Sequence, residues 1–199
     1  MTSAETAPEL GSPRPMRADA RRNYEKLIAA GREAFTEDGA SASLEEIARR
    51  AGVGIGTLYR HFPSRQALLE AVYVEEVEGL CRSADDLGDR GPWEALVAWL
   101  HRFVDYVGTK EALREELFAY VDHDADVFQR CHDMFYAAGE PLLRRAQQAR
   151  LVRPDADIMD VVRMVAGIAK MPSGTRQQID RVLDMALDGL RYRPPDVRD

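Results

Sequence analysis

The stretch SLEEIARRAGVGIGTLYRHFPSR, residues 43–65, decides the fold. Ser43 stands three positions before Glu46, which is the spacing of a capping box at the start of a helix. This signal predicts a short helix at residues 44–50. Gly52 closes it, because glycine readily adopts the left-handed turn that ends many helices. A tight glycine turn between two short helices is the pattern of a helix-turn-helix.

A second short helix is predicted from about Ile55 to the residue before Pro63. Its outer positions carry hydroxyl, guanidinium and imidazole groups, which suit phosphate oxygens and base edges of DNA. The three glycines at positions 52, 54 and 56 also raise the alternative of a nucleotide-binding loop. A dinucleotide loop requires a strand before the glycines, whereas a capped helix precedes them here, and the P-loop pattern is missing. We therefore expect a DNA-binding segment.

The stretch SLEEIARRAGVGIGTLYRHFPSRQALLEAV resembles the N-terminal signature of the TetR/AcrR family of bacterial transcription regulators, with a tight match over residues 24–77. This resemblance implies an all-α, nine-helix architecture with an N-terminal helix-turn-helix head and a C-terminal helical domain that dimerises and usually binds a small effector. It also implies a homodimer on a palindromic operator in double-stranded DNA, usually as a repressor that the effector releases. The positions that match the family's DNA-contacting residues are Ser43, Ile55, Gly56, Thr57, Tyr59, Arg60, His61 and Arg65.

Two positions are unusual for the family. Ile55 cannot hydrogen-bond a base, although its side chain could touch a thymine methyl group. Gly54 stands where a helix-capping Ser is common, and this exchange costs a helix only a few tenths of a kcal/mol. We therefore expect the second short helix to form without a side-chain contact to phosphate at that position.

Apolar residues recur at three- and four-residue steps along most of the chain, and no segment shows the period-two alternation of a strand. We expect helices at about 18–37, 44–50, 55–62, 65–87, 92–107 and 110–121, then one carrying Val127 to Leu142 with a kink or break at Pro141, then 156–170 and 175–191. The expected domains are a disordered arm at 1–16, a DNA-binding domain at 17–66, an effector-binding and dimerisation domain at 67–193 and a tail at 194–199.

The charge is unevenly distributed. Residues 14–66 hold ten Lys/Arg and seven Asp/Glu, a net charge of +3, which leaves −10 for the rest of a chain whose total is −7. A mildly basic N-terminal part suits an anionic partner. No apolar run approaches the ~20 residues of a membrane helix, and the N-terminus lacks a secretory signal. We therefore expect a cytoplasmic protein that does not contact a membrane.

The sequence offers no metal or cofactor motif. Cys81 and Cys131 form no CxxC pair, and we expect two reduced core thiols. His123, Cys131 and His132 are spaced poorly for a metal, since a helix places adjacent residues about 100° apart. We found no nucleophile with a plausible base, so an all-α enzyme is the weaker alternative.

The C-terminal domain is expected to hold an apolar pocket for a small hydrophobic or aromatic effector. The candidate lining residues are Trp99, His101, Phe103, Tyr106, Phe118, Tyr120, Phe128, His132, Phe135 and Met164. A regulator whose C-terminal domain binds another protein and no small ligand, or which activates transcription, remains open as an alternative.

The resemblance further implies that the last two helices pair with their copies to make a four-helix dimer interface. The apolar residues that would form it are Ile158, Val161, Val162, Val165, Ile168, Ile179, Val182, Leu183, Ala186, Leu187 and Leu190. Periodicity alone does not separate this interface from an ordinary intramolecular core, so both interpretations stand at this point.

Overall fold

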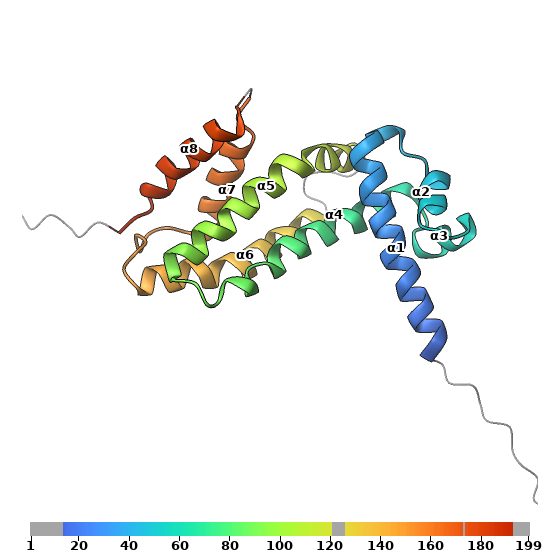
Figure 1. The fold of residues 1–199 in the computed structure, drawn as a ribbon, viewed down its shortest axis with the longest axis horizontal. Helices are drawn as coiled ribbons and strands as arrows, with labels where there is room; N and C mark the ends of the chain where they lie inside the picture. The colour runs from blue at the N-terminus through green and yellow to red at the C-terminus, as the bar shows by residue number, and fades with distance from the viewer. Residues whose placement is uncertain (1–13, 121–125, 173, 193–199) are drawn as a thin grey trace, which may run out of the picture. The chain divides into compact units, whose positions relative to one another are not determined.

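A computed structural model describes most of the chain as helix (Figure 1). It covers residues 14–120, 126–172 and 174–192, and the side chains of 14–17, 40 and 109–112 are not described. Within these residues the elements are α1 (Arg14–Asp38), η1 (Gly39–Ser41), α2 (Leu44–Arg50), α3 (Ile55–His61), α4 (Arg65–Arg82), η2 (Asp85–Leu87), α5 (Pro92–Phe118), α6 (Asp126–Gln148), α7 (Ile158–Ala169) and α8 (Arg176–Asp188). The described residues contain no strand, and the all-α fold class is confirmed.

The chain divides into two compact units between Leu68 and Leu69. The N-terminal unit, called the head below, contains α1, α2 and α3, with α2 packed against both of the others. The largest side chains of its core are fully buried, and they come from all three helices: Leu27, Phe35, Ile47 and Leu58. Burial of these residues holds the short helices α2 and α3, because helices of seven residues are unstable in isolation.

The C-terminal unit is a bundle in which α5 packs against both α6 and α7, and α7 packs against α8 (Figure 1). Trp99 and Leu100 of α5, Leu143 of α6 and Val165 of α7 are almost completely buried in one continuous core. This core and the polar outer faces of the helices match the three- and four-residue apolar spacing of the sequence.

Several predicted helix boundaries are wrong. Helix α1 begins at Arg14, so the last three residues of the expected arm are helical; Pro15 fits there because proline is tolerated in a first helical turn. The two helices expected at 92–107 and 110–121 are one continuous helix, α5. Gly108 lies inside it, since one glycine costs a helix only about 1 kcal/mol. The rest of the arm, residues 1–13, and the tail at 194–199 lie outside the described residues.

Three further features differ from the prediction: the path of α6 at Pro141, the end of α4 and the start of α8. Helix α6 continues through Pro141, so the break that we allowed for there is absent. Helix α4 ends at Arg82, short of the expected Leu87. Helix α8 begins with a capping box in which Thr175 and Gln178 satisfy each other's backbone N–H groups, a signal that the sequence analysis did not identify.

Candidate nucleic-acid interface and ligand pocket

Helix α2 begins at a side-chain cap. The Ser43 hydroxyl accepts a hydrogen bond from the backbone N–H of Glu46 at 3.1 Å, which confirms the cap. The reciprocal bond of a capping box does not form, because the Glu46 carboxylate instead accepts bonds from Arg49 at 2.7 Å and from Arg50 at 2.9 Å. These hydrogen bonds, that of Arg49 first, lower the pKa of Glu46 to about 2.

The turn after α2 has fixed geometry. Gly52 takes a φ of +67°, a left-handed conformation that favours glycine. Its N–H donates to the carbonyl oxygen of Arg49 at 3.1 Å, and the N–H of Val53 donates to that of Ala48 at 3.0 Å. This pair of bonds is the Schellman motif, which satisfies the last carbonyl groups of a helix. The turn therefore sets the direction in which α3 leaves.

Helix α3 is anchored by one buried side chain, and four of its other residues are exposed to solvent. Within α3, all of whose residues are described, Leu58 alone is buried. Ile55 is 38% exposed and Tyr59 is 47% exposed, and Gly56 and Arg60 are also exposed. Residues four apart lie on neighbouring turns of one face, so these four form a continuous surface, which we call the reading face. Gly54 caps α3 without a side-chain hydrogen bond, as expected.

The other predicted DNA contacts are less accessible. Thr57 is half-buried, and so is His61, whose ring lies 6.3 Å from the Tyr24 ring. The Arg65 guanidinium donates to the carbonyl oxygens of Gly39, at 2.9 Å, and Ala42, and it lies 5.0 Å from the Phe35 ring centroid. In this structure the hydrogen bonds of Arg65 therefore stabilise the turn between α1 and α2. A contact of Arg65 with phosphate stays a prediction.

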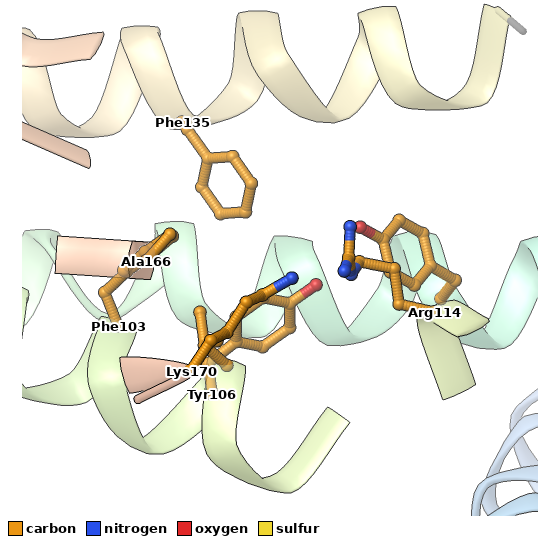
Figure 2. A pocket seen from close by; sticks show the side chains of 8 residues that line it. Phe103, Tyr106, Arg114, Phe135, Ala166 and Lys170 are labelled. Atoms are coloured by element: carbon orange, nitrogen blue, oxygen red, sulfur yellow. The ribbon is translucent and has the colours of Figure 1, made fainter. Parts of the chain in front are cut away.

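The C-terminal unit contains a cavity of about 130 Å³. Phe103, Tyr106 and Phe135, which the sequence analysis proposed as lining residues, do line it. The ring centroids of Phe103 and Phe135 are 5.3 Å apart in an edge-to-face arrangement. Figure 2 shows Phe135 pointing from α6 toward the residues of α5 across the cavity. Burial, followed by the neighbouring Tyr73, raises the pKa of Tyr106, so its hydroxyl stays protonated at neutral pH.

The other seven proposed lining residues do not line this cavity: Trp99, His101, Phe118, Tyr120, Phe128, His132 and Met164. Trp99 is completely buried in the core, and the Phe118 ring packs at 4.5 Å against that of Phe128. Tyr120 is 46% exposed. The role of these seven residues in effector binding stays a prediction.

Five lining residues were missed: Tyr73, Val107, Arg114, Ala166 and Lys170. The sequence contains a signal for the two cations, Arg114 and Lys170. Val107 and Arg114 are seven residues apart, and Ala166 and Lys170 are four apart, so each pair shares one helix face. Two cations that share a face with the apolar lining could have indicated a partly charged pocket.

The two cysteines have weakly reactive thiols, because burial raises the pKa of Cys81 to about 11 and that of Cys131 to about 12. Among the residues that the structure describes, no three His, Cys, Asp or Glu side chains gather as a metal site would need. His123 lies outside the described residues.

The predicted dimer interface divides into two groups. Seven of its residues are buried within the C-terminal unit, as the intramolecular alternative requires: Ile158, Val161, Val162, Val165, Leu183, Leu187 and Leu190. Ile168, Ile179 and Ala186 are half-buried. Val182 is 37% exposed, and the neighbouring Met185, which we had not predicted, is 74% exposed. The buried seven are therefore core residues, and α8 keeps an apolar strip on its outer surface.

Comparison with known proteins agrees with this architecture. Residues 27–72 match the family model "Bacterial regulatory proteins, tetR family", and residues 91–192 match the model "Transcriptional regulator SbtR-like, C-terminal domain". The chain belongs to the TetR family. As a member of this family it is a transcriptional regulator and not an enzyme, and regulators of this kind bind DNA and typically dimerise.

Solved TetR structures resemble this TetR-family chain over nearly their whole length. A TetR transcriptional regulator from Streptomyces coelicolor is 42% identical with a TM-score of 0.71, covering 85% of this chain and 98% of that one. A TetR regulatory protein from Mycobacterium vanbaalenii is 33% identical with a TM-score of 0.70, covering 89% and 99%.

Curated relatives of the TetR-family chain match over a shorter stretch. The HTH-type transcriptional regulator SrpR of Pseudomonas putida is 38% identical over 82 residues, which cover 40% of this chain and 38% of that protein. UidR of Escherichia coli is 36% identical over 94 residues, which cover 46% and 42%. The chain thus spans about two fifths of the length of these relatives. No helix in the described part of the chain is long and apolar enough to cross a membrane.

Proposed function

We propose that this TetR-family protein is a cytoplasmic repressor that binds a palindromic operator as a homodimer and leaves it when a small effector occupies the cavity. The observation that best supports operator binding is the reading face of α3. It presents Tyr59 and Arg60 to solvent, while Leu58 on the opposite side anchors the helix. A short helix anchored on one side and exposed on the other is suited to the major groove of DNA.

The chemistry of the reading face suits base edges and phosphates. Arg60 offers the planar fork of donors that pairs with guanine O6 and N7. The Tyr59 hydroxyl suits a phosphate oxygen, and Ile55 suits the methyl group of thymine. Gly56 has no side chain, so the backbone of α3 can approach the groove closely. Thr57, His61 and Ser43 at the start of α2 complete the proposed contacts.

The outer strip of α8 supports the dimer. Val182 and Met185 are three residues apart and exposed, and the half-buried Ile179 and Ala186 flank them. A second copy of this chain would cover these side chains through the same strip, since a twofold interface is self-complementary. The half-buried Ile168 of α7 extends the proposed contact.

Helix α4 supplies the link between the cavity and the head. Its first residues, Arg65 to Leu68, belong to the head, and Tyr73 farther along the same helix lines the cavity. An effector that binds one position of α4 better than another shifts the equilibrium between head positions. A cavity in the C-terminal unit favours a small ligand over a protein partner as the signal.

The test begins with selection of bound DNA from a random pool, which yields the operator. Arg60→Ala should weaken specific binding by about 1–3 kcal/mol, because it removes a base contact. Arg144→Ala is the matched control, since it removes an exposed arginine of α6 whose partner is Glu140 at 2.7 Å. Equal affinity of the Arg60 variant and the control for the selected operator would contradict the proposed reading face.

A further inference from the structure

We infer that the first turns of α1 form a second DNA contact, in which Arg17 and Arg21 bind phosphates beside the bases that α3 reads. This inference rests on the proposed function in taking operator DNA as the partner of the head. It adds a contact from a different part of the chain, because all of the DNA contacts proposed so far lie between Ser43 and Arg65.

The positive charge of residues 14–66 is concentrated in one segment. Residues 14–26 hold five Lys/Arg and two Asp/Glu, a net charge of +3. Residues 27–66, which contain α2 and α3, hold five of each and are neutral overall. The two carboxylates that precede this segment, Glu5 and Glu9, lie outside the described residues. The start of α1 is therefore the part of the described head that most suits a polyanion.

This segment is helical but does not contribute to the core. Among the described side chains of α1, the first buried one is Leu27, and residues 18–22 are all exposed. Figure 1 shows α1 continuing past α2 and α3 at this end. A helix from Arg14 to Lys26 is about 18 Å long, which is the length of several phosphates along one DNA strand. Packing within the head does not account for these turns, so their surface is available to a partner.

The register of α1 places two arginines on the face that contacts α3. The Tyr24 ring lies 5.3 Å from that of Phe62 and 6.3 Å from that of His61, a proposed DNA contact at the end of α3. Arg21 and Arg17 precede Tyr24 by three and seven residues, and these spacings bring residues to one face of a helix. This face, which we call the Tyr24 face, therefore continues the proposed DNA-binding surface of α3.

The chemistry of the Tyr24 face suits phosphate. A guanidinium binds phosphate oxygens through two parallel hydrogen bonds. Arg21 pairs with Glu25 at 2.9 Å, but the two side chains are 82% and 58% exposed. Ion pairs between exposed side chains are weak, so Arg21 can exchange this partner for a phosphate. Phosphate contacts position a protein on DNA without reading its sequence, and the Tyr24 face would therefore add affinity to the specificity of α3.

The experiment compares two double variants that lose the same charge from the same helix. Arg17→Gln, Arg21→Gln alters the Tyr24 face. Arg22→Gln, Lys26→Gln is the matched control, because both residues are two positions from Tyr24 and so lie about 200° around the helix from it. Fluorescence anisotropy of the labelled, selected operator measures the affinity of the full-length protein over a range of salt concentrations. Circular dichroism verifies that each variant is folded, and glutamine is a good helix former.

The two variants should differ in salt dependence. Each lost phosphate contact reduces the slope of log K against log[salt] by about 0.9. We expect the slope of the Tyr24-face variant to fall by at least about two, for one contact from each protomer of a dimer, and its affinity to fall at least about tenfold. The control should keep the slope of the wild type. An unchanged slope in the Tyr24-face variant, or equal reductions in both variants, would overturn the inference.

The inference and the proposed function fail in different ways. A protein that binds its selected operator with an unchanged slope in the Tyr24-face variant refutes the α1 contact and leaves the reading face intact. A protein that selects no sequence, but binds a random duplex with a slope that falls only in this variant, refutes the proposed repressor and retains the phosphate contact. The variant should select the same operator as the wild type, and a different selected sequence would refute a contact with phosphate alone.

Discussion

Gly139 of α6 lies so close to Trp99 of α5 that a Cβ atom at position 139 would stand 2.7 Å from Cζ3 of the indole. The same Cβ would stand 2.7 Å from Cγ1 of Ile158, at the start of α7. Real Cβ atoms do not approach other atoms so closely, because their van der Waals surfaces overlap at this distance. Three helices of the C-terminal unit therefore meet at a position where only glycine fits.

We expect Gly139→Ala to lower the free energy of unfolding by about 1–2 kcal/mol, because the cost of overpacking exceeds the gain in helix propensity. Urea denaturation measures this change. Gly79→Ala is the matched control: a Cβ atom on Gly79, inside α4, would meet nothing within 4 Å, so the exchange should raise stability by about 0.5–1 kcal/mol. A destabilising Gly79→Ala and a neutral Gly139→Ala would reverse the expectation.

Ser43 is expected to have two separable roles. Ser43→Ala removes the cap of α2 and should lower the stability of the head by about 0.5–2 kcal/mol. Ser43→Asp keeps a capping oxygen, so the head should remain stable, but its negative charge should weaken operator binding by repelling the phosphates. Denaturation and operator titration on both variants provide the measurements. Unchanged operator affinity in Ser43→Asp would remove Ser43 from the interface.

Arg65 is expected both to support the fold of the head and to contact phosphate. Arg65→Met removes the guanidinium donor from the carbonyl oxygens of Gly39, which keeps the N–H of Ala42, and of Ala42, and should destabilise the head by about 1–3 kcal/mol. Operator affinity measured over a range of salt concentrations distinguishes this role from a phosphate contact. Loss of a phosphate contact reduces the slope of log K against log[salt] by about one. We expect folded Arg65→Met to show this reduced slope together with its lower stability, and an unchanged slope would exclude the predicted phosphate contact.

The stability of the head should fall in acid through Glu46. Hydrogen bonds from Arg49 and Arg50 lower its pKa in the folded protein from 4.5 to about 2. A depressed folded-state pKa stabilises the fold above the unfolded-state pKa, and this contribution disappears as the pH falls from about 4.5 to 2. Urea titrations of wild type and Glu46→Gln across this range test the prediction, since the variant should depend less on pH. Parallel curves for the two proteins would exclude Glu46 as a source of the acid sensitivity.

Local signals predicted the head well. The limits of α2 follow from Ser43 at one end and Gly52 at the other, and both act through bonds within a few residues. The start of α3 at Ile55 follows from the same turn. Short-range backbone hydrogen bonding is encoded in neighbouring residues, so a single sequence contains the required information.

Contacts between distant helices were predicted less well. Trp99 was expected at the cavity, but it is completely buried in the core beside Gly139, and this position depends on how α5 packs against α6. Arg114 and Lys170 were missed because a charged residue on a helix is usually solvated, and only tertiary packing places both beside Phe135. The same limit explains why Val165 was expected between two chains but lies inside one.

The single buried residue of α3 also bears on how such a regulator changes during evolution. Within α3 only Leu58 is fully buried, so substitutions at Ile55, Tyr59 and Arg60 remove no side chain of the core. A gene duplicate could therefore acquire a new operator through a few codon changes in α3 while its stability is retained. Divergent target sites would be accessible to its descendants without compensating mutations elsewhere in the protein.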